Sequence, residues 1–504
     1  MLRPSVWILG DQLLANHPAL SAVKGKENVQ VVIVESQQRI QKQPYQRKKL
    51  VLLLSAMRHY AEDLRHQGYV VDYVKADTFR TGLKKHVIQK NSNELITMAA
   101  ATYEGRRFQK ELEKELEVPI LILPNTQFLV GTYDPIPDPE PGKRYVMEMF
   151  YRAMRRRFGL LMEGKEPVGG KWNFDAANRK KLPKNLKPPL PISFSPDDIT
   201  KEVMVEIAEM LNGVGTVDSF DYAVTRTQAL SAFRDFLDHR LPLFGDYEDA
   251  LTSRSHIIYH SHLSPYLNLG LLEPLELATA VEWAYDAGLV PINSAEGFIR
   301  QIIGWREFMY WQYWRQMPGI MDENSWDAQQ ELPGFVWTGD TDMACLAFAI
   351  KRALDTGYNH HIERLMLLCN FFMLAGVNPR KVNDWFLSLY VDAYEWVMPP
   401  NVIGMGLNAD GGLTATKPYI ASANYINKMG DHCAGCRYDP KQRLGEDACP
   451  FNALYWNFVL QHEDRLRSNP RTSRSVWGLR HLDPAEREHV RHQAAAFLDA
   501  LVYT

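Results

Sequence analysis

The chain has 504 residues, of which 46% are hydrophobic and 11% aromatic, and its formal net charge is −3. This composition excludes a disordered chain and predicts about three globular domains of roughly 150 residues each, with large buried cores. The charge excludes a uniformly basic nucleic-acid binder but not a local basic face, for which residues 143–157 are a candidate.

The first residues and the cysteine content indicate where the protein works. The apolar run at residues 6–9 is too short for a signal peptide, and no stretch of 18 apolar residues follows. Five cysteines suit a reducing compartment, in which disulfides are rare. We therefore expect a cytoplasmic monomer without a membrane partner.

Short β-branched runs alternate with amphipathic segments through the first 130 residues. This alternation is typical of a doubly wound parallel sheet, so we predict an α/β domain over 1–130. Gly10, Asp11 and Gln12 stand at the carboxyl end of the first strand, where such sheets bind ligands, although Asp11 could instead only cap a loop. The expected strands are residues 6–9, 29–34, 69–74, 95–99 and 120–123, with helices such as 49–65 and 107–117 between them.

The pattern then changes twice. Residues 131–199 are rich in proline and glycine on both sides of a basic amphipathic helix at 145–162, which predicts an interdomain linker with structure of its own. From residue 200 onward the apolar spacing is helical almost throughout. We predict a large all-α domain over 200–504.

Four cysteines form a spaced set in this helical half. Cys433 and Cys436 make a CxxC motif, Cys449 precedes a proline, and Cys345 lies far upstream. A CxxC motif lets two thiolates bind one ion or one edge of a cluster. The four thiolates could hold zinc or an iron–sulfur cluster, although a zinc ribbon normally uses two such motifs. Cys369 lies in an apolar helix, where an inert buried thiol is expected.

Two adjacent histidines precede an arginine on one predicted helix. His360 and His361 should point about 100° apart, so they cannot both face one small ligand equally. Arg364 follows on the same helix, and the acidic Asp392 lies downstream. The plainer alternatives are that a histidine here packs in the core and that Arg364 and Asp392 form an ordinary ion pair.

The tracts at 221–227, 260–267 and 301–308 resemble the flavin-binding half of the photolyase and cryptochrome family. With the cysteines, and with the segments 167–175 and 417–419, the chain resembles the bacterial iron–sulfur branch, the prokaryotic (6-4) photolyases, over essentially its whole length. The resemblance implies light-driven repair of UV-damaged DNA by reduced FAD. It also implies a 4Fe-4S cluster on the four cysteines and a 6,7-dimethyl-8-ribityllumazine antenna.

The resemblance assigns residues to the cofactors. Ser261, Ser264 and Arg306 would supply hydroxyls and a cation to the pyrophosphate of FAD, although Ser264 before Pro265 could simply cap a helix. Asp11, Gln12 and Glu35 would hold the antenna, and Arg39 replaces a residue that is commonly acidic in the branch. The FAD set implied in full is Tyr222, Arg226, His260, Ser261, His262, Leu263, Ser264, Gln301, Arg306, Arg364, Asp392 and Met398.

Catalysis is assigned in the same way. His361 would lie between flavin and lesion, and a pKa near 6.5 suits proton donation near neutral pH, with His360 in support. The second active-site histidine of the animal and plant enzymes is replaced by Leu365, so His360 or water must take that role. Met398 stands at the position that usually faces flavin N5, and it cannot exchange a proton, which leaves Glu395 or water for that task.

Electron supply and DNA contact complete the expectations. Trp385 would be the proximal electron carrier, but Phe386 replaces the tyrosine that follows it in the branch, and Trp337 is a further relay candidate. The DNA-facing rim would comprise Lys171, Trp172, Tyr419 and Tyr425. For each aromatic residue the alternative is ordinary packing.

Two other functions fit parts of this pattern. A blue-light photoreceptor would keep the same flavin, antenna and cluster but would signal to partners. A light-independent nucleic-acid module, organised by the cysteine centre, would leave the sheet domain and the flavin tracts unexplained.

Overall fold

The β-branched runs near the amino terminus form a five-stranded parallel sheet in the order β3-β2-β1-β4-β5. The computed structural model describes residues 3–140 and 143–501. The five strands lie within a few residues of their predicted positions, so the predicted doubly wound α/β fold is confirmed. They are β1 (Arg3–Ile8), β2 (Gln30–Ser36), β3 (Val70–Ala76), β4 (Ser92–Met98) and β5 (Ile120–Leu123).

Side chains of β1 alternate between two cores, as a strand buried on both faces requires. Trp7 packs with residues of α4 and α5 in a core that is local to the sheet. Val6 and Ile8 belong to a core that continues through α3 into the helical region. One face of the sheet is therefore joined to the rest of the molecule. The helices here are α1 (Pro18–Ser21), α2 (Gln37–Ile40), α3 (Arg47–His66), α4 (Phe79–Lys90) and α5 (Tyr103–Leu116), with η1 at Lys26–Asn28.

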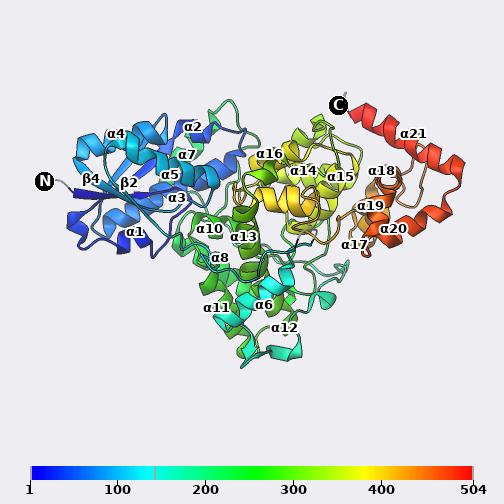
Figure 1. The fold of residues 1–504 in the computed structure, drawn as a ribbon, viewed down its shortest axis with the longest axis horizontal. Coiled ribbons are helices and arrows are strands. Elements are labelled where there is room, and N and C mark those ends of the chain that lie inside the picture. Colours follow the sequence, from blue (N-terminus) through cyan, green and yellow to red (C-terminus); the bar gives the residue numbers. More distant parts are fainter. Residues whose placement is uncertain (1–2, 141–142, 502–504) are drawn as a thin grey trace.

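Helix α7 (Asp198–Ala208) returns to this part of the molecule. It packs against α3, and its Glu206 binds Arg58 at 2.6 Å and Lys75 at 2.8 Å. Figure 1 shows α7 beside the blue elements of the sheet. The segment before α7 contains α6 (Met147–Phe158), the strand pair β6 (Met162–Glu163) and β7 (Glu166–Pro167), and the short turns η2 (Val168–Gly170) and η3 (Asp175–Ala177).

The rest of the chain is helical, as expected, and fills the centre and right of Figure 1. The division at 130 and 199 stays a prediction. In chain order the helices are α8 (Arg226–His239), α9 (Leu241–Phe244), α10 (Ser264–Leu269), α11 (Pro274–Asp286), α12 (Ile292–Ile299), α13 (Glu307–Gln316), α14 (Ala344–Thr356), α15 (Asn370–Leu374), α16 (Pro379–Leu389), α17 (Ala423–Met429), α18 (Pro450–Gln461), α19 (Glu463–Ser468), α20 (Ser473–Trp477) and α21 (Pro484–Leu501). Short 3₁₀ turns are η5 (Gly319–Asp322), η6 (Gly334–Trp337), η9 (His432–Gly435) and η10 (Gly478–His481).

Three widened π-helical turns interrupt this region, and such turns are frequent at functional sites. They are η4 (Arg300–Arg306), η7 (Glu363–Cys369) and η8 (Pro400–Gly406). The first two contain Arg306 and Arg364, both expected at the flavin. Because a π turn inserts a residue into the helix, it changes the direction of the side chains that follow.

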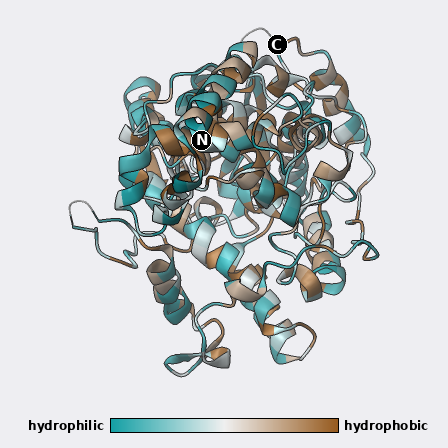
Figure 2. Ribbon diagram, turned by 90° about the vertical axis from the view of Figure 1, so that its right-hand side faces the viewer, coloured by the Kyte–Doolittle hydropathy of each residue, from teal (hydrophilic) through white to brown (hydrophobic). Residues whose placement is uncertain are grey.

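Most helices carry teal and brown residues side by side in Figure 2, as amphipathic helices around a shared core do. No helix within residues 3–140 and 143–501 is long and apolar enough to cross a membrane.

Candidate functional site

Asp392 lies buried at the centre of a set of charged and polar contacts. Arg364 on η7 donates to both of its carboxylate oxygens, at 2.9 and 3.1 Å, and the Ser264 hydroxyl donates to Oδ2 at 2.7 Å. Asn268 donates to its backbone carbonyl at 2.8 Å. Burial alone would raise the pKa of Asp392, but the Arg364 charge and these hydrogen bonds lower it below the ordinary value. The carboxylate therefore stays ionised.

Ser264 is the first residue of α10 and not its cap. The N-cap position belongs to Leu263, and the Ser264 hydroxyl is used for Asp392 instead. The alternative that Ser264 only caps a helix is therefore wrong. Pro265 at the next position lacks the N–H that would otherwise be unbonded in a first turn.

Three buried imidazoles lie near the Arg364–Asp392 ion pair. The rings of His260 and His360 stack with centroids 4.6 Å apart and an angle of 11° between them. His262 lies 4.4 Å from the Tyr358 ring and 5.2 Å from the Tyr222 ring. Burial lowers the pKa of His262 to about 3, and it lowers the pKa of His260 and of His360 well below the ordinary value. All three are therefore neutral.

Several nitrogens of these rings lack hydrogen-bond partners. Nε2 of His260, Nε2 of His262 and both ring nitrogens of His360 are buried and unbonded within residues 3–140 and 143–501. An unpaired buried polar atom costs about 1–3 kcal/mol, so such a group indicates a place for a polar ligand. The cluster therefore fits a cofactor with many hydroxyl and phosphate oxygens, as FAD has.

The neighbouring His361 has a different environment. Its side chain is 48% exposed, and its Nε2 lies 3.7 Å from Asp249 Oδ1. Its ring meets the His260 ring edge-on at 5.3 Å. The two adjacent histidines thus diverge as predicted, one inside the buried cluster and one at its solvent side, while their chemical roles stay predictions.

Other residues that are predicted to bind flavin lie on several separate segments of the chain. Tyr222 donates to the Thr356 carbonyl at 2.8 Å, and Gln301 donates to Glu248 at 2.6 Å. Met398 is 5% exposed, whereas Ser261 is only partly buried.

Arg306 is buried beside the sheet. It donates to Glu307 at 2.6 Å and to the Gln127 carbonyl at 3.2 Å, and it lies over the Phe128 ring at 4.5 Å. Its Nε and Nη2 find no partner in the part of the chain that the structure describes. Arg306 therefore keeps two donors for an anionic group.

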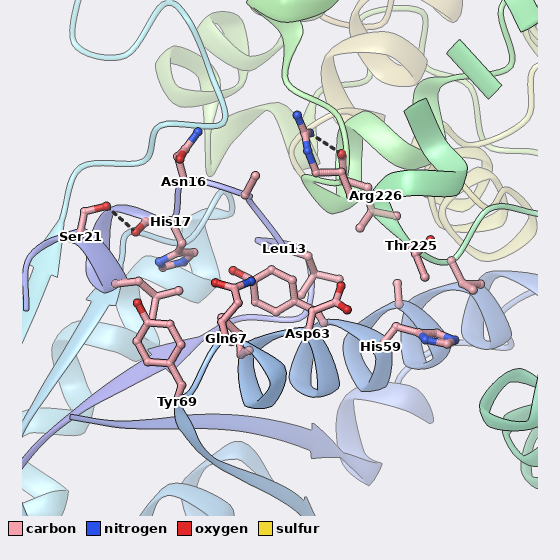
Figure 3. A pocket seen from close by; sticks show the side chains of 17 residues that line it. Leu13, Asn16, His17, Ser21, His59, Asp63, Gln67, Tyr69, Thr225 and Arg226 are labelled. Carbon is pink, nitrogen blue, oxygen red and sulfur yellow. Dashed lines mark hydrogen bonds between the residues drawn. The ribbon is translucent and has the colours of Figure 1, made fainter. Parts of the chain in front are cut away.

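Arg226 faces a different cavity. It donates to Glu276 at 2.9 and 3.0 Å and to the Leu271 carbonyl at 2.9 Å, so its charge is already paired. Figure 3 shows it across a cavity of about 260 Å³ from His17, Asp63 and Tyr69 of the sheet region. The contacts of Arg226 give no support to a flavin role, which stays a prediction.

The sheet region contains a larger cavity of about 650 Å³ at the carboxyl ends of its strands. Asp11 and Glu35 line it, as the antenna prediction requires, and burial raises the pKa of Asp11 to about 6. Glu35 is already bound by Arg58 at 2.9 Å and by the Tyr73 hydroxyl. Gln12 is fully buried and donates to the Ala99 carbonyl at 3.0 Å, outside the lining of this cavity.

Both regions contribute to the wall of this cavity. Glu395 from the helical region accepts hydrogen bonds from Arg39 at 2.9 Å and Lys42 at 3.0 Å. Lys49 on α3 donates to the carbonyls of Leu387 and Ala393, at 2.8 and 2.6 Å, and burial lowers its pKa to about 7. Lys49 thereby holds the backbone on both sides of Asp392.

The four spaced cysteines meet at one narrow, mostly apolar cavity. Cys345 lies on α14, Cys433 on η9, Cys436 directly after it, and Cys449 caps α18. Burial and the neighbouring sulfurs raise the pKa of Cys433 to about 11, and burial raises that of Cys449 to about 12. Thiolates here therefore need a cation. Cys369 is buried elsewhere in the core, as expected.

No group of three or more histidine, cysteine or acidic side chains within the described ranges is arranged for a single metal ion. The four sulfurs nevertheless line a common space with Met343, Ile426 and Phe451.

Trp385 and Trp337 are in contact. Their ring centroids are 6.5 Å apart, and Trp385 is 1% exposed, with Nε1 donating to the Val336 carbonyl at 3.2 Å. Sequence reasoning missed Tyr390, which lies 6.2 Å from Trp385 and 4.0 Å from the Arg364 guanidinium. The only sequence signal for this position of Tyr390, between Trp385 and Arg364, was its place two residues before Asp392.

The four rim residues divide into two groups. Trp172 is covered by the guanidinium groups of Arg152, Arg155 and Arg156 at 4.6–5.3 Å, and Lys171 beside it is exposed. Tyr419 and Tyr425 are partly buried, and burial raises the pKa of Tyr425 to about 12. Asp249 contributes to the electrostatic environment of both tyrosines and also lies beside His361. Tyr419 and Tyr425 are therefore near the exposed histidine.

Comparisons with known proteins agree with this arrangement. Residues 6–222 match the family model described as deoxyribodipyrimidine photo-lyase-related protein. The chain resembles the fold of a bacterial class III photolyase from Agrobacterium tumefaciens, at a TM-score of 0.61 and 17% identity over 100% of this chain and 98% of that one. A cryptochrome from Synechocystis gives 0.58 and 16% over 81% of this chain and 84% of that one.

A curated relative gives the closer assignment. The (6-4) photolyase of Agrobacterium fabrum is 42% identical over 505 aligned residues, which cover 98% of this chain and 99% of that protein. Identity at that level over the whole length includes the sheet, the flavin tracts and the cysteine segment together. The chain belongs to the (6-4) photolyase family.

Proposed function

We propose that the protein repairs (6-4) photoproducts in UV-damaged DNA in a light-driven reaction. The full-length identity to a (6-4) photolyase carries this proposal. The divergent histidine pair beside the buried Arg364–Asp392 pair supports it, because repair needs a shielded cofactor and an accessible proton donor at adjoining positions.

FAD is the cofactor that the family implies, and the buried unbonded nitrogens of His260, His262 and His360 fit it. When bound, FAD supplies the electron that enters the lesion on illumination. Arg364 provides a fixed cation that favours negative charge in the cluster, and Asp392 holds that cation in place. Arg306, with two free donors, would bind a phosphate oxygen.

His361 would transfer the proton that repair requires. A lesion inside the base stack cannot reach a buried site, so the damaged pair must be flipped out, and its poor stacking lowers that cost. The half-exposed ring of His361 is accessible to such a pair, and its Nε2 lies 3.7 Å from Asp249 Oδ1. His360 is fully buried and neutral, so it would orient His361 without exchanging protons itself.

We further propose a 4Fe-4S cluster on Cys345, Cys433, Cys436 and Cys449. Zinc is the alternative, but a zinc ribbon normally uses two CxxC motifs, whereas this chain has one, at Cys433 and Cys436. The cavity at the strand ends would hold the lumazine antenna, since its volume of about 650 Å³ lies in the range of ligand pockets. Asp11 would contact that ligand, whereas Gln12 would act through the Ala99 backbone.

The experiment is illumination of the reduced, flavin-loaded protein with oligonucleotides that carry a (6-4) photoproduct or a cyclobutane dimer. We expect repair of the (6-4) lesion under blue light and none in the dark. A protein that binds flavin and repairs neither lesion would contradict the proposal and favour a photoreceptor.

A further inference from the structure

A surface pocket of about 410 Å³ lies between the 408–418 segment and the 465–472 segment, beside Trp326. It belongs to neither candidate cofactor site. Lys143, Arg144, Lys417 and Arg465 line it, and Arg471 is at its edge, bonded to Thr416 of the lining. Five cations therefore surround one small concave surface, in a chain whose net charge is −3.

None of these five cations forms an ion pair with any carboxylate in residues 3–140 and 143–501. The acid in the lining is Asp410, and its carboxylate accepts hydrogen bonds from the backbone N–H groups of Gly412 and Thr414, at 2.9 and 2.8 Å. Burial also raises the pKa of Asp410. Asp410, which also interacts electrostatically with Arg465, is thus one carboxylate against five cations, so the pocket has a net positive charge.

The cations are held in position by neutral groups. Arg471 donates to Thr416 Oγ1 at 2.7 Å, and Arg144 donates to the Thr416 carbonyl. Arg465 lies 3.5 Å above the Trp326 ring and donates to Ser325 Oγ at 2.9 Å. Like charges held together without a counter-ion repel each other, and a bound anion would relieve that repulsion.

The pocket adjoins the face that carries His361. Lys417 Nζ lies 5.7 Å from the centre of the Tyr419 ring. Asp249 is close enough to Tyr419 to influence its pKa, and the same acid lies 3.7 Å from His361. Lys417, Tyr419 and Asp249 thus connect the pocket to the surroundings of His361.

We propose that this cationic pocket, formed by Lys143, Arg144, Lys417, Arg465 and Arg471, binds backbone phosphate of the DNA outside the lesion. The inference rests on the proposed function, since the DNA is the repair substrate. Phosphate contacts fix the register of a duplex but carry no sequence information. The pocket therefore contributes affinity and position, while selection of the damaged pair occurs at His361.

The test uses the full-length, flavin-loaded protein with Lys143→Ala and Arg471→Ala combined, because both residues are exposed. The matched control removes two other exposed lysines, Lys84 and Lys110 on α4 and α5, and so causes the same change in net charge. Affinity for damaged and undamaged duplex is measured at several salt concentrations. The slope of log affinity against log salt should fall by about two in the pocket variant and stay unchanged in the control.

Both duplexes should lose affinity by the same factor, about tenfold or more at 0.1 M salt. The conservative pair Lys143→Arg and Arg471→Lys should keep the wild-type slope. An unchanged slope in the alanine variant, or a loss confined to damaged DNA, would overturn the inference. Wild-type protein that binds DNA in this manner but repairs no lesion would instead refute the proposed function and leave the pocket assignment standing.

Discussion

The Arg364–Asp392 cluster and the cysteine cavity differ in how their side chains are held. Asp392 is bound by Arg364, Ser264 and, at its backbone, Asn268, so the pair is oriented by protein groups alone. Among the cysteines, Cys436 has one weak contact, 3.6 Å from its sulfur to the Asp342 carbonyl. Burial, with the neighbouring sulfurs, raises the pKa of Cys345, Cys433 and Cys449.

This difference indicates two ways of building a cofactor site. The flavin cluster is organised before a ligand arrives, and binding completes it. The cysteine cavity lies where α14 meets the segment at 432–449, and the proposed cluster would add metal–sulfur bonds to protein contacts such as Phe348 against His432, with ring centroids 5.3 Å apart. Loss of a ligand side chain should therefore affect folding in the second site and chemistry in the first.

The largest effect is expected for Cys436→Ala. Three thiolates would leave the cluster incomplete, so the protein should be insoluble or poor in flavin. Yield, iron content and flavin absorbance measure this. The matched control is Cys369→Ala, since that thiol is buried outside the cavity and its loss should leave iron and flavin in place. Soluble Cys436→Ala protein with full flavin and repair would refute a structural cluster, and zinc in elemental analysis would refute iron.

A second, smaller effect tests the chemistry. His361→Ala should bind flavin, photoreduce and bind damaged DNA, while repair per bound flavin falls by 10²–10⁴, the usual contribution of general acid catalysis. The measurement is repair yield under saturating lesion. A near wild-type yield would remove His361 from the mechanism.

His360→Ala is the natural control for that variant. Its ring is fully buried against His260, so its removal should lower flavin occupancy and stability. Repair per bound flavin should decline less than in His361→Ala. Equal losses in both variants would mean that the histidine pair acts only as packing.

Asp392→Asn tests the preorganised pair directly. It leaves the Arg364 cation buried without a counter-charge, which typically costs about 3–5 kcal/mol. We expect lower flavin occupancy and a lower free energy of unfolding by that amount. Ser264→Ala removes a single hydrogen bond to the same carboxylate and should cost about 1 kcal/mol. Similar values for the two variants would show that the ion pair is not what stabilises the cluster.

The last effect appears only as pH dependence and concerns His17, a buried histidine of the sheet region. Burial lowers its pKa to about 4, so the folded state binds fewer protons than the unfolded state, whose histidine titrates near 6.5. Its contribution to stability is present above pH 6.5 and is lost as the pH falls toward 4. Between pH 6.5 and 5 the wild type should lose about 1.6 kcal/mol more than His17→Asn.

Denaturant unfolding at both pH values measures this difference. The Ala19 N–H donates to His17 Nδ1 at 3.2 Å. Asparagine at position 17 keeps an acceptor for this N-cap bond but does not titrate. Equal pH dependence in wild type and variant would show that His17 is not neutral in the folded protein.

The sheet was predictable from the sequence because its strands are short, β-branched and separated by amphipathic helices. The cysteine set and the Arg364–Asp392 pair were also predictable, from spacing and family resemblance. The burial of His360 and the exposure of His361 could not be assigned individually, because the stacking partner His260 lies about 100 residues upstream. Such a contact leaves no signal in the local pattern.

Two arginines illustrate the same limit. Arg226 and Arg306 both lie in tracts that resemble flavin-binding segments, yet Arg226 is paired with Glu276 while Arg306 lies against Phe128 beside the sheet. Their side-chain directions depend on long-range partners and, for Arg306, on the π turn that contains it. The return of α7 to pack on α3 likewise depends on Arg58 and Glu206, 148 residues apart in the chain.

The wall of the cavity at the strand ends is built by both the sheet region and the helical region. Binding in this cavity therefore affects how the two regions unfold. Arg39 on α2 and Lys49 on α3 belong to the sheet region, whereas Glu395, Leu387 and Ala393 belong to the helical region. A chromophore that fits between the two regions binds only while they are docked, so its binding stabilises their contact. At a free concentration one hundred times its dissociation constant, this stabilisation is about 2.7 kcal/mol. Occupancy of an antenna cavity would thereby make the thermal melting of the two regions a single cooperative event.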